Sequence, residues 1–501
     1  MSGKDQNTVA SLEVLPPEIL LPIVKSLPGL DTLWNLMTAS PNTWRLFSNY
    51  ALDITEGILS GPNSILYGKI RELVRGVILV RAKTLPFEDL NEFQTQFLYG
   101  AVPNQQKYEE FMALGPGTLS ASTVPADVFR SVVATAYHLS ALSQGCLASY
   151  LAPFRDIRPL HVSDPQALHA SSPPSWTLSP TGLMGCRLGC SFQNDRTPVW
   201  DREAAGTPVK VVDAGQPSWL EEMRALCAMW VIQLVGEIKG LVKDGWPEED
   251  IDTLKQIDLV DLVERPNGAI KAEEIRCAME YLTTLGDAIQ NNHYRLPTPV
   301  LDLKSHKWIT AERKLVNNPM VLVGHRHNGK LLTLGKGEPI PEGSEPVWYP
   351  FLRDDMKWER AEPFPNRESC GISSWRSLSK SHKSPVYGVK FDSFRRLGFA
   401  FWDRKRLHLA GLADGIHEPF YKNDFYFFAL ESILPADEVA SIKAEIPERE
   451  VPRIAPRRRS RDLIPLGTAP SLPASSLSTR RAALRLSSLS TQPVSGSHET
   501  H

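Results

Sequence analysis

The sequence predicts a mainly α-helical protein with a smaller part of mixed α and β structure. Apolar residues recur at helical spacing through residues 13–152 and again through residues 218–296, whereas residues 297–445 hold short apolar runs between turn signals. With 42% hydrophobic and 22% charged residues in a chain of 501, we expect a large core and two or more structural units. Residues 1–12 are polar and residues 446–501 are rich in Pro, Ser and Arg, so both ends are expected to be disordered.

The first periodic segment spans residues 13–50, and its first helix is expected to begin at two prolines. Pro16 and Pro17 suit a first helical turn, whose amide donors have no partner, and Glu18 places a negative charge near the positive end of the helix dipole. The apolar residues of this helix recur along one face at four-residue steps, with two more that widen it: Ile19, Leu20, Ile23, Val24 and Leu27. Pro22 is expected to kink the helix, which ends before the Pro-Gly pair at residues 28–29.

Two further helices are expected in the same segment. Asp31 is the predicted N-cap of the second, and Ser40 followed by Pro41 provides the N-cap and first turn of the third. The second helix carries Leu33, Leu36 and Met37, and the predicted buried residues of the third are Trp44 and Phe47. Three helices in fewer than about forty residues cannot bury all of their apolar surface among themselves, so something else must cover the remainder.

This segment resembles the F-box, a family with a Leu-Pro-x-Glu opening, an Ile- and Leu-rich first helix, a Leu-rich second helix and a terminal aromatic residue. The matching residues are, in order, Leu15, Pro16, Glu18, Ile19, Ile23, Leu27, Leu33, Leu36 and Trp44. The resemblance covers about residues 13–48, and it departs from the family at residues 39–43, where Ala-Ser-Pro-Asn-Thr replaces the usual Val-Cys/Ser and basic residues. It implies that the exposed face docks on a Skp-type adaptor and ties the protein to a cullin-based ubiquitin ligase. The predicted adaptor contacts are these matching residues together with Leu20. Residues 397–407 also resemble a stretch of uncharacterised fungal F-box proteins.

Residues 51–152 are expected to be helical, with three amphipathic patterns. The first spans residues 69–82, the second residues 87–98, and the third residues 125–151, with fraying predicted at Ser-Gln-Gly 143–145. The apolar side of the first pattern consists of Ile70, Leu73, Val74, Val77 and Ile78.

An irregular segment and then a small helical bundle are expected next. Nine prolines interrupt residues 153–217, which limits regular structure to short pieces. Ser218 is the predicted N-cap of a long helix that ends by Gly245, and helical patterns at residues 248–264 and 271–289 complete a predicted three-helix bundle. The predicted buried face of the long helix consists of Trp219, Met223, Leu226, Trp230, Leu234 and Ile238.

The mixed region, residues 297–445, is predicted to contain a β-hairpin. Two apolar runs, residues 320–323 and 331–334, flank the pair Asn328-Gly329, which is a strong signal for a tight hairpin turn. The tryptophans of this region stand in loop-rich sequence, where large rings can bury much area without regular structure: Trp348, Trp358, Trp375 and Trp402.

Several short motifs match known chemistry only in part, so no catalytic residue, cofactor or metal site is predicted. Residues 324–330 have the Gly-Lys spacing of a phosphate-binding loop, but a leucine follows the lysine where Ser or Thr is needed, and the next element is a predicted strand. His325 and His327 would share one face of a strand, and Cys186 and Cys190 stand four positions apart. Each pair supplies only two of the three or four ligands that zinc needs.

The serine pair and the carboxylate pairs likewise lack the surroundings of a catalytic site. Ser373 and Ser374 lack the Gly-x-Ser-x-Gly setting of a nucleophile elbow. The adjacent carboxylates at 221–222, 248–249 and 354–355 diverge in direction, so each is expected to be a helix-start or solvated charge.

Composition predicts an intracellular protein, cytoplasmic or nuclear. The first residues lack the apolar core of a secretory signal, and no apolar run approaches the roughly twenty residues of a membrane helix. Six dispersed cysteines predict reduced thiols. A basic cluster in the tail is compatible with an import signal, a polyanion-binding arm or a solubilising tail: Arg457, Arg458, Arg459 and Arg461. No stacking aromatic residues accompany it, so no specific nucleic-acid binding is expected.

The function expected from these observations is that of an F-box protein that recruits an as yet unidentified protein substrate to a Skp–cullin–F-box ligase and performs no bond chemistry itself. Three alternatives stay open. The adaptor-bound complex could be a scaffold with no degraded client. The chain could be an enzyme whose site lies in residues 219–435 and whose N-terminal segment is only structural. Residues 13–48 could also be an ordinary helical hairpin packed on the rest of the chain.

Overall fold

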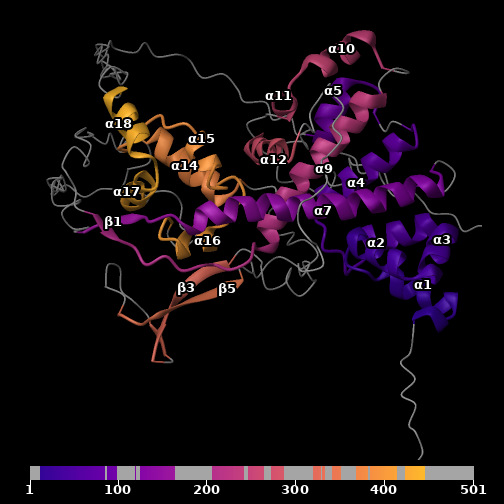
Figure 1. Cartoon of the computed structure of the whole chain (residues 1–501), viewed down its shortest axis with the longest axis horizontal. Helices are drawn as coiled ribbons and strands as arrows, with labels where there is room; N and C mark the ends of the chain where they lie inside the picture. Colours follow the sequence, from indigo (N-terminus) through magenta and orange to yellow (C-terminus); the bar gives the residue numbers. More distant parts are fainter. Residues whose placement is uncertain are drawn as a thin grey trace, which may run out of the picture. The chain divides into compact units, whose positions relative to one another are not determined.

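The structure of the chain is a computed structural model, which is predominantly helical with two small antiparallel sheets (Figure 1). It describes residues 12–84, 87–98, 119, 124–163, 206–241, 246–263, 272–286, 320–328, 330–332, 341–350, 368–381, 384–413 and 424–445. All of them belong to the first of two compact units, Met1–Arg449. The predicted fold class is confirmed for these residues. The predicted disordered ends and most of residues 153–217 lie outside them.

The N-terminal segment forms the predicted helices. The elements are the 3-10 helix η1 (Leu12–Val14), α1 (Pro17–Lys25), α2 (Leu30–Ala39) and α3 (Pro41–Ser60). Ser40 caps α3 as predicted, because the amide of Thr43 donates to its Oγ at 3.2 Å. The predicted N-cap of α2 is wrong: Gly29 occupies that position, and Asp31 lies inside the first turn with its side chain buried. A Cβ at Gly29 would come 2.4 Å from the Asp31 carboxylate, so glycine leaves room for that group.

Much of the apolar surface of this segment is covered by the protein itself. The long helix α7 (Ala126–Arg155) packs along α2 and α3. The Arg130 guanidinium of α7 lies 5.0 Å from the ring centroid of Trp44, and it donates to Ser48 Oγ at 3.2 Å across 82 positions of sequence. The cover that the N-terminal helices need therefore comes in part from a distant helix of the same chain.

The helices of residues 51–152 match their predicted ranges, with one correction. α4 (Gly68–Arg81) buries all five residues of its predicted apolar side, and α5 (Leu90–Glu92) continues into the π-helix η2 (Phe93–Leu98). The fraying predicted at residues 143–145 is wrong, because α7 is continuous there. Ser143 donates its hydroxyl to the Leu139 carbonyl at 2.8 Å within the helix, so this polar side chain is satisfied although it is buried.

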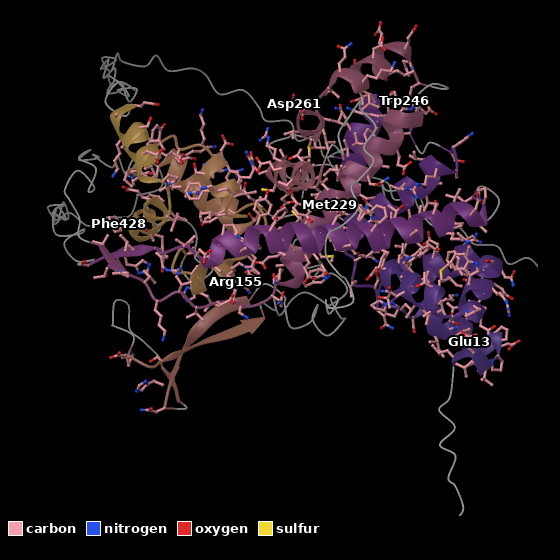
Figure 2. The ribbon with its side chains drawn as sticks, in the orientation of Figure 1. Glu13, Arg155, Met229, Trp246, Asp261 and Phe428 are labelled. Carbon is pink, nitrogen blue, oxygen red and sulfur yellow. The ribbon has the colours of Figure 1, made fainter. Side chains whose placement is uncertain are left out.

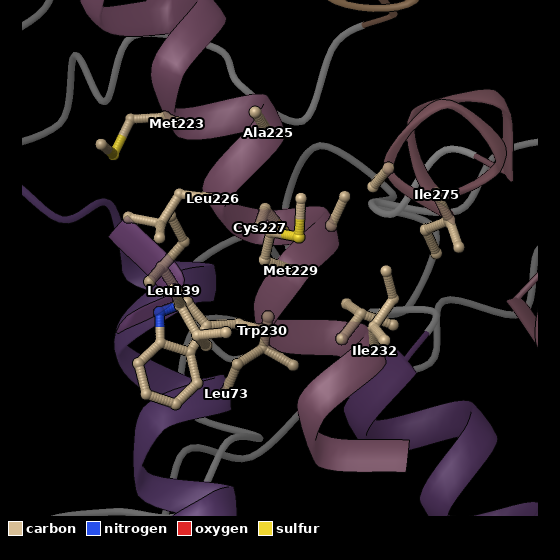
Figure 3. Packing of buried hydrophobic residues seen from close by; sticks show 14 of the residues in the cluster. Leu73, Leu139, Met223, Ala225, Leu226, Cys227, Met229, Trp230, Ile232 and Ile275 are labelled. Atoms are coloured by element: carbon tan, nitrogen blue, oxygen red, sulfur yellow. The ribbon is translucent and has the colours of Figure 1, made fainter. Parts of the chain in front are cut away.

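Helix α9 (Trp219–Leu241) lies at the centre of the helical core. Its N-terminus is a capping box in which the Ser218 amide donates to Glu221 Oε2 at 2.8 Å and the Glu221 amide donates to Ser218 Oγ at 3.3 Å, which confirms the predicted cap. The helix packs against α4, α7 and α12 (Ala272–Thr284). Figure 3 shows its side chains between Leu139 and Leu73 on one side and Ile275 on the other.

This packing changes the predicted bundle of residues 218–296. Its long helix is part of a larger core built with N-terminal helices, because its side chains are buried on nearly every side rather than along one face. The pattern at 248–264 forms two helices, α10 (Glu248–Gln256) and α11 (Leu259–Val263), since Asp258 Oδ1 accepts from the Val260 amide at 2.7 Å and starts a new helix. Gly245 lies outside the described residues.

Both sheets are antiparallel. β1 (Leu160–Val162) pairs with β2 (Gly206–Pro208) at the two ends of the proline-rich segment. The second sheet has the order β4-β3-β5, formed by β3 (Met320–His327), β4 (Lys330–Leu332) and β5 (Glu345–Pro350). The predicted hairpin is confirmed, and Asn328 has φ 51°, the left-handed conformation that this turn requires.

The C-terminal part of the described chain is a group of short helices around aromatic residues. They are α14 (Cys370–Lys380), α15 (Asp392–Arg395), α16 (Arg404–Leu409), α17 (Asp424–Ser432) and α18 (Ala436–Glu445). Phe394, Phe399, Phe401 and Trp402 are fully buried, and rings of α7 residues Tyr150 and Phe154 contact the last three. Gly398 has φ +75°, and a Cβ at Gly371 would lie 2.1 Å from the Phe399 carbonyl oxygen, so both glycines permit backbone geometry that larger residues oppose.

Candidate functional site

Four large apolar side chains are exposed at the start of the described chain, and we call them the N-terminal apolar patch. They are Leu12, Val14, Ile19 and Ile23, with exposed fractions of 38%, 80%, 54% and 40%. Elsewhere among the residues whose side chains the structure places, the exposed large apolar side chains are Tyr50 and Val212. The four residues lie within twelve positions of one another in the sequence, and exposed apolar residues that are concentrated rather than scattered are typical of an interaction surface. Figure 2 labels Glu13, which stands between Leu12 and Val14.

The geometry of α1 explains why part of its apolar surface is exposed. Leu20 and Val24 are 2% and 0% exposed and belong to the core, since α1 packs against α3. Ile19 and Ile23 each precede one of these residues by one position, which turns them about 100° around the helix axis and out of the core. The predicted apolar face is therefore divided between the interior of the protein and solvent.

The exposed residues stand on a supported frame. Asn42 at the start of α3 donates its Nδ2 to the Glu13 carbonyl at 2.5 Å, which ties η1 to α3. Lys25 at the end of α1 forms an ion pair with Asp53 at 2.7 Å. These two contacts tie the segment to α3 at η1 and at the end of α1.

The predicted adaptor contacts separate into three groups by exposure. Pro16, Glu18, Ile19 and Ile23 are exposed. Leu15, Leu27, Leu36 and Trp44 are half-buried. Leu20 and Leu33 are buried in the core of the protein.

This placement changes the expected contact set in two ways. Leu20 and Leu33 are covered by their own chain, because α3 and α7 pack against α1 and α2, so we remove them from the set. Leu12 and Val14 enter it, although no sequence pattern had indicated them. The available signal was two apolar residues spaced two apart just before the Leu-Pro pair.

Asp31 is a buried acidic group of the same N-terminal segment, in the first turn of α2. Its side chain is 5% exposed, and Oδ2 has no hydrogen-bond partner among the described residues. Burial raises the pKa of Asp31 to about 6, against the effect of hydrogen bonds from the backbone amides of Asp31 and Thr32. The N-terminal segment thus contains a carboxyl group that titrates well above the usual range of an aspartate.

A second feature is a pocket of about 390 Å³ between the end of α7, the extended segment after β2, and α16. We call it the arginine pocket, because Arg155, Arg158 and Arg406 line it. Its other lining residues are Phe154, Val209, Val211, Val212, Asp213 and Ala214. Arg155 is labelled in Figure 2.

The charges in the arginine pocket are partly paired. Arg155 Nε lies 3.1 Å from Asp213 Oδ2. Partial burial would raise the pKa of Asp213, but the Gly215 amide and the guanidinium groups of Arg155 and Arg406 hold that pKa below its ordinary value. Arginine stays protonated and Asp213 stays ionised at neutral pH, so these groups are suited to binding charge rather than to transferring protons.

Arg406 is held by a buried ion pair with Glu221 of α9. Its Nε and Nη2 donate to the two carboxylate oxygens at 2.9 and 2.8 Å, and both side chains are almost fully buried. Burial and the nearby charge of Asp403 raise the pKa of Glu221, although its partner Arg406 acts in the opposite direction. Burial would lower the pKa of Arg406, but the Glu221 carboxylate raises it above its ordinary value. Glu221 is at a helix start as predicted, but it is not solvated.

The remaining sequence motifs have structural roles or lie outside the described residues. Lys330 begins strand β4 rather than the helix that a phosphate-binding loop requires. Ser373 and Ser374 lie inside α14, and Cys186 and Cys190 are outside the described residues. In the part of the chain that the structure describes, no three His, Cys, Asp or Glu side chains come together as a metal site.

The described helices include none that is both long enough and apolar enough to cross a membrane. Comparison of the chain with protein-family models, with curated proteins and with solved structures gives no match.

Proposed function

We propose that this chain is an F-box-type receptor subunit, which docks on a Skp-type adaptor through the N-terminal apolar patch and brings a client protein to a cullin-based ubiquitin ligase. The observation that carries the proposal is the exposure of Ile19 and Ile23 within a segment that resembles the F-box. A partner that covers them would remove from water the apolar surface that the chain leaves uncovered.

Burial of these side chains by a partner can contribute a measurable part of the binding free energy. Burying a fully exposed isoleucine contributes roughly 1.5 to 3 kcal/mol. Ile19 and Ile23 are 54% and 40% exposed, so together they retain about one isoleucine side chain of exposed surface. Their loss should weaken adaptor binding by about tenfold to a hundredfold. Leu12 and Val14 add further surface of the same kind.

Charge substitution at the two isoleucines tests this proposal. The Ile19→Asp/Ile23→Asp variant and the native chain are each titrated against a purified recombinant Skp-type adaptor by isothermal calorimetry. We expect the native chain to bind and the variant to lose binding, because carboxylates in an apolar contact are costly to desolvate. Both positions face solvent, so circular dichroism and thermal unfolding should remain those of the native chain.

Val212→Asp is the control for a carboxylate placed on another exposed aliphatic side chain. It should bind the adaptor as tightly as the native chain. A native chain that does not bind the adaptor, or an Ile19→Asp/Ile23→Asp variant that binds undiminished, would contradict the proposal. A receptor should also have at least one associated protein that accumulates when cullin activity is inhibited, whereas a scaffold should have none.

A further inference from the structure

The arginine pocket has hydrogen-bond donors that its own residues leave available. Arg158 Nη1 donates to the carbonyls of Arg155 and Ile157 at 3.2 and 2.7 Å, which fixes the orientation of the guanidinium. Its Nε and Nη2 have no hydrogen-bond partner among the described residues, and Arg155 uses its Nε on Asp213. An arginine whose planar group is oriented and still has free donors is suited to bind an oxyanion.

The pocket also has an excess of positive charge. Arg406 is neutralised by Glu221 and Arg155 by Asp213. Arg158 has no carboxylate partner in the described part of the chain. These pairings leave one positive charge, that of Arg158, so a ligand group with one negative charge would balance it.

One wall of the pocket is aliphatic and pre-formed. It consists of Val209, Val211 and Val212, of which Val212 is 48% exposed. The Val209 amide donates to the Pro159 carbonyl at 3.0 Å and the Val212 amide donates to the Leu409 carbonyl at 2.9 Å, so the backbone of this wall is held from both sides. An aliphatic wall beside guanidinium groups favours a peptide over a nucleic acid, whose bases prefer exposed aromatic rings, and Phe154 is only 4% exposed.

The pocket is rigidly connected to the N-terminal helices. Arg130 and Arg155 lie on the same uninterrupted helix, α7, one beside Trp44 and the other in the pocket. At 1.5 Å per residue, these two positions are roughly 37 Å apart along the helix axis. An occupant of the pocket would thus be held at a defined distance from the helices that pack on the other end of α7.

We propose that the arginine pocket binds an extended peptide that has an oxyanion, a carboxylate or a phosphate, next to an aliphatic side chain. The oxyanion contacts the free donors of Arg158 and Arg155, and the aliphatic side chain packs on Val212. That this peptide belongs to a client protein rests on the proposed function. The binding itself does not depend on it.

Fluorescence polarisation with short labelled peptides tests the proposal on the full chain. In the probes, a central glutamate, phosphoserine or glutamine stands between two valines. We expect the glutamate and phosphoserine peptides to bind, and the glutamine peptide to bind at least about tenfold more weakly, because it lacks the charge-assisted hydrogen bonds. The glutamate and phosphoserine peptides distinguish the two sources of the oxyanion.

Two variants locate the binding site. Arg155→Gln/Arg158→Gln should reduce the affinity for both anionic peptides about tenfold or more, to that of the glutamine peptide. Folding should be retained, because the ion pair that is lost is exposed. Arg276→Gln/Arg376→Gln removes the same number of positive charges elsewhere and should bind as the native chain does. Val212→Asp should weaken the binding of all three peptides, because it places a charge in the aliphatic wall of the pocket.

Three outcomes would overturn the proposal: equal binding of the glutamate and glutamine peptides, undiminished binding by Arg155→Gln/Arg158→Gln, or preferential binding of a single-stranded oligonucleotide. The Ile19→Asp/Ile23→Asp variant separates this proposal from the proposed function, because it should bind peptide normally. If the native chain binds peptide but not the adaptor, only the proposed receptor function is refuted. If it binds the adaptor but not peptide, only the proposed peptide binding by the arginine pocket is refuted.

Discussion

The buried carboxyl group of Asp31 predicts an unusual pH dependence of stability. Burial raises its pKa from 3.8 to about 6, and Oδ2 lacks a hydrogen-bond partner among the described residues. Because the pKa is higher in the folded than in the unfolded state, the folded protein binds the proton more tightly. The stability associated with protonated Asp31 is fully present below pH 3.8 and is lost as the pH rises through about 6.

The magnitude follows from the size of the pKa shift. A shift from 3.8 to about 6 corresponds to roughly 3 kcal/mol of destabilisation once Asp31 is ionised in both states. At pH 4 this cost is only about 0.5 kcal/mol, since the group is then protonated in the folded state and still partly protonated in the unfolded chain. Asp31→Asn keeps the shape and remains neutral, so it removes this pH dependence.

We expect the difference in unfolding free energy between Asp31→Asn and the native chain to shift by roughly 2 kcal/mol in favour of the variant between pH 4 and pH 8. Urea unfolding followed by tryptophan fluorescence at several pH values measures this difference. Asp53→Asn is the control, because its side chain is 52% exposed and its ion pair with Lys25 should contribute less than about 1 kcal/mol. An Asp31→Asn variant whose stability parallels that of the native chain across this range would refute the argument.

Three further changes test the packing, each by the urea midpoint. Arg406→Met should cost about 3 to 5 kcal/mol, because it leaves Glu221 as an uncompensated buried charge, and adding Glu221→Gln should recover part of the loss; no recovery would argue against the ion pair. Ser40→Ala should cost about 1 kcal/mol through loss of the α3 cap, and an unchanged midpoint would show that this cap adds nothing. Gly371→Ala should cost about 1 to 3 kcal/mol, because its Cβ would lie 2.1 Å from the Phe399 carbonyl oxygen. An unchanged urea midpoint would mean that α14 can shift away from Phe399 without loss of stability.

Prediction from sequence succeeded where a few neighbouring residues decide the structure. The caps at Ser40 and Ser218, the apolar side of α4 and the hairpin turn at Asn328 all depend on contacts within one turn or one hairpin. It failed where a local signal competed with distant packing. The fraying predicted in α7 did not occur, because Ser143 satisfies its hydroxyl within the helix while the surrounding residues are buried in the core.

The two candidate sites likewise combine features set by local sequence with features set by distant packing. The sequence by itself determined that residues 13–50 form short amphipathic helices, because their spacing and caps are local properties. Only the tertiary structure decided that Ile19 and Ile23 face solvent while Leu20 and Val24 do not, since that depends on where α3 and α7 pack. The arginine pocket likewise unites side chains that are far apart in the chain, and the pair of Glu221 with Arg406 spans 185 positions. No local pattern encodes such a contact, because it arises when separate helices bury their apolar surfaces together.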